Sequence, residues 1–157
     1  MPHHASPSQP LHIVVADDHP VVRQSARFLL EAAPRPWRVH EADSGQEALR
    51  LLRQPQFGLA ILDLAMPGLN GFELIVCVRA CRPDVPVVIL TMCAEEQVAL
   101  RALRAGVQAY VTKDSAGREL VPAVDRVVAG GSFLSAALAE RVPLWHQAVG
   151  SRPPLSS

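Results

Sequence analysis

The stretch Leu59-Ala60-Ile61-Leu62-Asp63 decides the fold of this 157-residue chain, because four apolar residues run directly into a carboxylate. A short and fully apolar run is typical of a strand that is buried on both faces, as in a parallel sheet covered by helices. In such sheets, ligands bind outside the carboxyl ends of the strands. Asp63 is therefore expected at the functional edge of an α/β sheet.

Similar short runs flank this stretch on both sides. They are Leu11 to Ala16, Trp37 to Ala42, Val87 to Leu90 and Ala109 to Val111. Segments with apolar residues at helical spacing separate the runs, and Pro20 and the Ser44-Gly45-Gln46-Glu47 capping-box pattern mark two helix starts. Alternating strands and helices predict a parallel sheet with helices on both faces. Right-handed crossovers favour a five-stranded doubly wound sheet of order 2-1-3-4-5, the flavodoxin-like arrangement.

Composition narrows the class of protein. Hydrophobic residues make up 49% of the chain, which is enough for one buried core. The chain has no apolar run of about 20 residues and no signal-peptide pattern at its start, so we expect a cytoplasmic protein without membrane contact. Fifteen basic and fifteen acidic residues give a formal charge of zero, which argues against nucleic-acid binding by these residues. The three cysteines are interpreted as packed thiols.

Polar residues follow four of the expected strands. Asp17 and Asp18 follow the first, Asp63 the third, Thr91 the fourth and Lys113 the fifth. Each has an ordinary explanation alone, as a helix cap, a turn residue, a strand-end hydroxyl or a solvated charge. In the order 2-1-3-4-5 these four strands are contiguous, so the side chains are expected to converge.

The expected cluster suits phosphoryl chemistry. Three close carboxylates repel one another unless protons or a hard cation offset their charge. Oxygen ligands of this kind favour Mg²⁺, which also bridges to phosphate groups. A carboxylate such as Asp63 accepts a phosphoryl group as an aspartyl phosphate, and Lys113 and Thr91 offer an ammonium and a hydroxyl to the phosphoryl oxygens.

Four motifs in this order resemble the receiver domains of two-component response regulators. They are Asp17-Asp18-His19-Pro20, Asp63-Leu64-Ala65-Met66-Pro67-Gly68-Leu69-Asn70-Gly71, Leu90-Thr91-Met92 and Tyr110-Val111-Thr112-Lys113-Asp114. The resemblance implies that a sensor histidine kinase phosphorylates Asp63, so the chain is a regulatory phosphoacceptor and not an enzyme acting on other substrates.

The same resemblance implies roles for particular residues. Mg²⁺ is expected on Asp18, Asp63 and the main-chain carbonyl of Ala65, with Asp17 nearby or bound through water. Thr91 and Tyr110 resemble the switch pair of the family, which reorients on phosphorylation. Slow self-dephosphorylation is expected, because Ala65 and Cys93 occupy the two positions that tune this reaction in the family and neither orients a water molecule well.

The Asp-His-Pro and Lys-Asp sequences, with Gly131-Ser132-Phe133-Leu134-Ser135 and residues 136–142, resemble the NarL/FixJ (LuxR-type) subgroup. We therefore expect a disordered extension over residues 1–10, a receiver domain over 11–131, and an interdomain linker helix and tail over 132–157. The resemblance implies a possible homodimer, and DNA contact only through a helix-turn-helix domain that this chain lacks.

Three other classes of protein share parts of this pattern. A flavodoxin-type cofactor module needs a Ser/Thr/Gly-rich phosphate cradle after the first strand, where this chain has Asp17 and Asp18. A phosphatase with an aspartate nucleophile usually has an Asp-x-Asp pair after its first strand, whereas here the proposed nucleophile Asp63 follows the third strand and its second-next residue is Ala65. A pseudo-receiver, which binds partners without phosphorylation, typically lacks an acidic residue or the lysine, and both are present here. Asp114 departs from the proline that many receivers have after the lysine.

Overall fold

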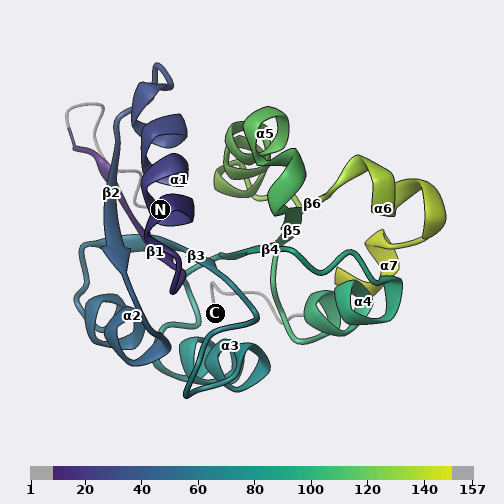
Figure 1. The fold of residues 1–157 in the computed structure, drawn as a ribbon, viewed down its shortest axis with the longest axis horizontal. Helices are drawn as coiled ribbons and strands as arrows, with labels where there is room; N and C mark the ends of the chain where they lie inside the picture. Colours follow the sequence, from purple (N-terminus) through teal and green to yellow (C-terminus); the bar gives the residue numbers. More distant parts are fainter. Residues whose placement is uncertain (1–8, 150–157) are drawn as a thin grey trace.

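The structure, a computed structural model, describes residues 9–149; the ends of the expected N-terminal extension and C-terminal tail, residues 1–8 and 150–157, lie outside this range. One parallel sheet crosses the molecule in the order β2-β1-β3-β4-β5-β6 (Figure 1). Its strands are β1 (Leu11–Ala16), β2 (Trp37–Ala42), β3 (Phe57–Leu62), β4 (Val87–Thr91), β5 (Ala109–Thr112) and β6 (Phe133–Leu134). The predicted order 2-1-3-4-5 is confirmed, and a short sixth strand extends it.

Helices cover both faces of the sheet, as the strand-helix alternation predicts (Figure 1). Helices α1 (Pro20–Ala32) and α5 (Ala116–Val128) cover one face, while α2 (Gly45–Leu52), α3 (Gly71–Cys81) and α4 (Glu96–Arg104) cover the other. Local signals begin several of these helices. Pro20 is at the first position of α1, and the Ser44 side chain accepts a hydrogen bond from the Glu47 backbone N–H.

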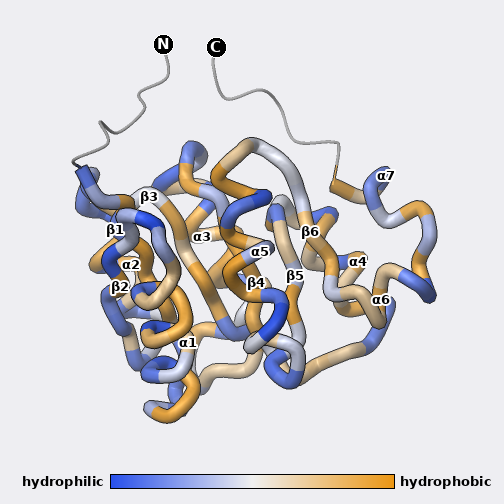
Figure 2. The backbone as a smooth tube through the Cα atoms, turned by 90° about the horizontal axis from the view of Figure 1, so that it is seen from above, coloured by the Kyte–Doolittle hydropathy of each residue, from blue (hydrophilic) through white to orange (hydrophobic). Residues whose placement is uncertain are grey.

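Two apolar clusters, one on each side of the sheet, form the core. Residues Ile13, Val15, Ile61, Val88 and Val111 pack against α1 and α5. The alternate residues of the same strands pack against α2, α3 and α4, because successive side chains of a strand point to opposite faces. Figure 2 shows the central strands as hydrophobic and much of the outer chain as hydrophilic. The apolar runs therefore place the polar strand ends at one edge of a rigid sheet.

Residues 133–149, called here the C-terminal segment, fold onto the receiver body. They contain β6, which pairs with β5, followed by α6 (Ala136–Arg141) and α7 (His146–Val149), and α7 lies beside α4 (Figure 1). Leu138 is fully buried and Trp145 nearly so. The sequence identified a helix here but did not predict the strand or this packing. Within the described residues, no helix is both long and apolar enough to span a bilayer.

Candidate phosphoacceptor site

The ends of β1, β3 and β5 bring two carboxylates and an ammonium together, as the sequence predicts. Asp17 and Asp63 are 1% and 2% exposed. The Lys113 Nζ atom is 2.8 Å from Asp17 Oδ2 and 3.0 Å from Asp63 Oδ2. One cation thus bridges two buried acids, because a lone charge at this depth would be strongly unfavourable.

The bridge alters the ionisation of its members. Burial disfavours the charged form of Asp17, but hydrogen bonds from Lys113 and from the backbone and ring of His19 outweigh it, so the Asp17 pKa is lowered. Burial also opposes the charge on Lys113, yet its contacts with Asp17 and Asp63 raise its pKa. The lysine therefore stays positively charged beside the proposed phosphoacceptor.

Asp18 and His19 complete an acidic cluster that fits a divalent cation. One ligand atom from each of Asp17, Asp18, His19 and Asp63 lies within 4.8 Å of all the others. Within the described residues, the buried Asp18 Oδ1 accepts no hydrogen bond, and His19 Nδ1 is 3.1 Å away. A buried carboxylate oxygen in this state favours a cation. The sequence predicted the three aspartates but missed His19, whose position next to Asp18 was the available signal.

The loop after β3 is held close to Asp63. The Ala65 backbone N–H donates to Asp63 Oδ1 at 3.2 Å, so both carboxylate oxygens of Asp63 have a partner. The loop returns to α3 at Gly71, where a Cβ atom would lie 2.5 Å from the Leu64 Cα. Only glycine allows this approach. The expected role of the Ala65 carbonyl as a metal ligand stays a prediction.

Thr91 and Tyr110, the expected switch pair, meet at the loop after β4. The Cys93 backbone N–H donates to Thr91 Oγ1 at 3.4 Å, and the Tyr110 hydroxyl donates to the Cys93 carbonyl at 2.7 Å. Tyr110 is fully buried, and its burial is the main cause of its raised pKa. The tyrosine therefore already lies inside the protein when Asp63 is unmodified.

Beyond Lys113, the chain forms a short 3₁₀ turn, Lys113–Ser115, that leads into α5. No peptide bond in the described residues is cis, so the bond between Lys113 and Asp114 is trans. A trans bond agrees with the high cost of a cis bond before a residue other than proline. The departure from the family pattern at Asp114 leaves Lys113 in contact with the acids.

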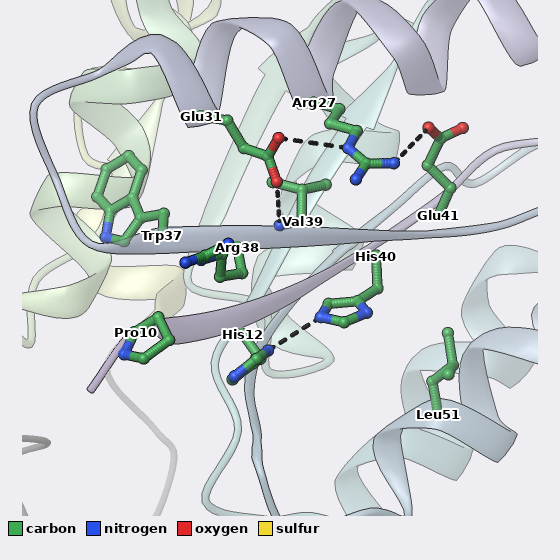
Figure 3. Close-up of a pocket in the computed structure, with 10 residues that line it drawn as sticks. All are labelled: Pro10, His12, Arg27, Glu31, Trp37, Arg38, Val39, His40, Glu41 and Leu51. Carbon is green, nitrogen blue, oxygen red and sulfur yellow. Dashed lines mark hydrogen bonds and ion pairs between the residues drawn. The ribbon is translucent and has the colours of Figure 1, made fainter. Parts of the chain in front are cut away.

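A hollow at the β2 edge of the sheet is lined by none of the predicted site residues (Figure 3). Figure 3 shows His12 and His40 on one side of the strands, with His12 Nδ1 2.9 Å from His40 Nε2. On the other side, Glu31 accepts a hydrogen bond from the Val39 backbone N–H at 2.9 Å. Because Val39 lies on the edge strand β2, this bond occupies a backbone donor that a sheet edge otherwise offers to another chain.

The fold and the acidic cluster are those of a receiver, and comparison with known proteins agrees. Residues 13–125 match the response regulator receiver domain family, so the chain belongs to it. Its relatives are response regulators of the NarL/FixJ (LuxR) type, which are signalling proteins.

Response regulator GacA of Pseudomonas aeruginosa is 31% identical over 134 residues, covering 85% of this chain and 63% of GacA. The transcriptional regulatory protein YhcZ of Bacillus subtilis is 37% identical over 133 residues, covering 84% of this chain and 61% of YhcZ. The crystal structure of a LuxR-family response regulator from Aurantimonas has a TM-score of 0.80 and 34% identity, covering 87% of this chain and 97% of that one. The chain thus spans less than two thirds of the length of these two curated relatives.

Proposed function

We propose that this chain is the phosphoacceptor switch of a two-component system, in which Asp63 takes a phosphoryl group from a phosphohistidine of a sensor kinase. The supporting observation is the setting of Asp63. It is buried at the end of the central strand, in contact with Lys113 and beside two further carboxylates. All the acidic and basic groups that this chemistry needs are therefore within reach of one another.

In the proposed reaction, a carboxylate oxygen of Asp63 attacks the phosphorus atom. The bond between phosphorus and the imidazole nitrogen breaks, and the departing imidazole keeps the electron pair and takes up a proton. The product is an acyl phosphate on Asp63. Lys113 offsets the added negative charge, and the Thr91 hydroxyl donates to a phosphoryl oxygen.

The donor set fits Mg²⁺, which would supply neutralisation of the phosphoryl charge. Asp18, Asp63 and the Ala65 carbonyl would hold the ion, with Asp17 nearby or bound through water. Carboxylate and carbonyl oxygens are the ligands that this ion prefers. The close carboxylates also explain why a cation is needed, since an added phosphoryl group would otherwise increase their repulsion.

The switch that we propose centres on the loop after β4. A phosphoryl group carries roughly −1.5 to −2 charges and three strong acceptors, so it attracts the Thr91 hydroxyl. Thr91 then gives up its contact with the Cys93 N–H. Because Tyr110 is already buried, it responds through its bond to the Cys93 carbonyl and not by moving into the core.

The output that we propose follows the relatives. Phosphorylation shifts the population between two packings of the loop and α4, and thereby favours a homodimer. YhcZ, one of the longer relatives, is a transcriptional regulatory protein. We propose that the whole protein that carries this receiver also regulates transcription, that it binds DNA through a further domain, and that it acts in the cytoplasm. We expect slow dephosphorylation, because Ala65 and Cys93 do not position an attacking water.

The experiment is phosphorylation by acetyl phosphate with Mg²⁺, read by intact mass. The unaltered chain should gain one phosphoryl group, and Asp63→Asn should gain none. Asp43→Asn is the matched control, because Asp43 is exposed and follows a strand end outside the cluster. Labelling of Asp63→Asn to the same extent as the unaltered chain would refute the proposal. A pseudo-receiver, the second candidate, would show no labelling of either protein.

A further inference from the structure

The C-terminal segment lies against α4 and shares its apolar cluster. Leu138 and Trp145 belong to the same apolar cluster as three residues of α4, which are Ala99, Ala102 and Leu103. Figure 1 shows α6 and α7 next to α4, at the end of the sheet that carries β6. The segment therefore covers a surface of α4 that would otherwise be open to solvent or to a partner.

One end of the segment is firmly anchored to the body. The Ser135 hydroxyl donates to the buried Glu119 carboxylate at 2.6 Å, and the Ala136 N–H donates to the same carboxylate at 3.0 Å. Ser135 Oγ also accepts from the Thr112 N–H at 2.9 Å. Hydrogen bonds to a charged acceptor are strong, and these are buried. We therefore expect β6 and the start of α6 to stay in place.

The far end of α6 has a weaker hold, and it contacts the loop after β4. Arg141 donates to the Ala94 carbonyl at 3.0 Å and lies 3.6 Å from Glu96. The side chain of Arg141 is 49% exposed, so this contact contributes little free energy compared with the buried anchor. The position of this contact is important for the switch, because Ala94 directly follows Cys93, the residue that contacts both Thr91 and Tyr110.

Two neighbouring carbonyls of this loop are thus held from opposite sides. Tyr110 donates to the Cys93 carbonyl from inside the protein, and Arg141 donates to the Ala94 carbonyl from the C-terminal segment. The Cys93 N–H meanwhile contacts Thr91. Any movement of Thr91 toward a modified Asp63 changes the position of the acceptor that Arg141 uses.

We propose that α4 and the loop before it are a docking surface for the chain's own C-terminal segment, and that phosphorylation of Asp63 weakens this docking. Docking through Arg141 holds the loop in its unmodified arrangement. Because linkage is reciprocal, a contact that phosphorylation weakens must itself oppose the phosphorylated state. The inference rests on the proposed function of Asp63, and it assigns to Arg141 a role that the receiver motifs do not contain.

Tryptophan fluorescence tests the docking directly. The chain has two tryptophans, so Trp37→Phe leaves Trp145 as the sole reporter. With Mg²⁺ and beryllofluoride, a phosphoryl mimic, we expect Trp145 emission to move to longer wavelength as the residue leaves its buried position. Fluorine NMR of bound beryllofluoride measures the occupancy of Asp63 in the same sample, and circular dichroism confirms that the variant is folded.

Arg141→Ala in the same background tests the reciprocal effect. Without beryllofluoride it should already shift Trp145 emission toward the released value, and it should bind beryllofluoride about two- to fivefold more tightly, in keeping with the modest contribution of a half-exposed contact. Arg53→Ala, which changes an exposed arginine at the end of α2, is the matched control and should change neither quantity. Glu96→Gln removes the ion pair but keeps the Ala94 contact, so its effect should be much smaller than that of Arg141→Ala.

The outcomes separate the two proposals. If fluorine NMR shows beryllofluoride on Asp63 while Trp145 emission stays unchanged, the docking inference is wrong and the function of Asp63 stands. If Arg141→Ala binds beryllofluoride no more tightly than the Arg53→Ala control, the restraining role of Arg141 is wrong. If the unaltered chain binds no beryllofluoride and takes no phosphoryl group, the proposed function fails, and the inference fails with it.

Discussion

Two cations flank the central strand β3, one beyond each end, and they are held in different ways. Lys113 contacts Asp63, which directly follows the strand, and Arg82 donates to the carbonyl of Phe57, its first residue. Their side chains are similarly buried, at 10% and 15% exposed. Lys113 faces two buried carboxylates, whereas the buried bonds of Arg82 go to the backbone carbonyls of Leu52, Gln54 and Phe57 at 2.8 to 3.0 Å. Arg82 also contacts a carboxylate, that of Asp84 at 3.1 Å, but this side chain is 62% exposed.

The difference separates a responsive contact from a static one. Backbone carbonyls do not titrate, bind phosphoryl groups or attract a competing cation strongly, so the three buried bonds of Arg82 serve the fold under all ordinary conditions. Carboxylates do all three, so the bonds of Lys113 depend on charge at the site. The contacts of Lys113 therefore respond directly to a change of charge at Asp63, whereas the buried contacts of Arg82 do not.

Lys113→Met should produce the largest effect. It leaves Asp17 and Asp63 buried without their shared cation, which should lower the free energy of unfolding by about 3 kcal/mol at neutral pH. Phosphorylation by acetyl phosphate should slow roughly 100-fold, as when one donor to a developing charge is lost. Urea unfolding and intact mass measure the two effects.

The stability deficit of Lys113→Met should depend on pH and on cations. Because the pKa of Asp17 is lowered in the fold, its ionised carboxylate stabilises the unaltered protein at pH values above 3.8, the ordinary pKa of the group. This contribution is lost as the pH falls from 3.8 through the lowered pKa. The deficit of the variant should therefore shrink in acid, and Mg²⁺ should recover part of it at neutral pH. A deficit that is equal at pH 3.5 and pH 7 would contradict the assignment of Lys113 as the counter-charge of the acids.

Arg82→Met should destabilise the fold without this dependence. Three carbonyls lose a charged donor, and a hydrogen bond of this kind contributes about 1.5–3 kcal/mol; since the vacated carbonyls gain partial access to water, we expect a loss of about 2 kcal/mol in all. The loss should be the same at pH 5 and pH 8 and should not change with Mg²⁺. Urea unfolding series at the two pH values check this, and recovery by Mg²⁺ would show that the contrast with Lys113 is false.

Glu31→Ala tests the same contrast at an exposed edge. The Val39 N–H loses its acceptor, and because Glu31 is 34% exposed we expect a loss of only about 0.5–1 kcal/mol. The bond from Val39 is the main cause of the lowered pKa of Glu31, so this contribution is present above the ordinary value of 4.5 and is lost as pH falls. Glu31→Gln keeps an acceptor and should lose less than Glu31→Ala, as thermal unfolding would show.

The His12–His40 pair should give the smallest effect. Burial, and then the neighbouring His12, lower the pKa of His40 below 6.5, so the folded protein binds fewer protons there than the unfolded chain. The stabilising contribution is full above pH 6.5 and falls as pH drops toward the lowered value, by a few tenths of a kcal/mol for a group this accessible. His40→Gln should flatten thermal stability between pH 7.5 and 5.5, and an unchanged slope would count against this interpretation.

Much of the site followed from local sequence because β-α repetition determines where strands end. Apolar runs such as Leu59 to Leu62 define the strands, and the next polar residue then lies at the functional edge. The convergence of Asp17, Asp63 and Lys113 was predicted in this way and is confirmed. His19 was missed, because its ring position depends on the start of α1 and not on the strand pattern.

The sequence by itself determined the parallel sheet, the order of its first five strands and the family, since these depend on short apolar runs and on motifs that are contiguous in the chain. Only the tertiary structure decided that Lys113 bridges both acids, that Tyr110 is already inside, and that the C-terminal segment reaches the loop after β4 through Arg141. These features join residues that are far apart in sequence. Their partners are chosen by burial and by the need to pair each buried charge, which no local pattern records.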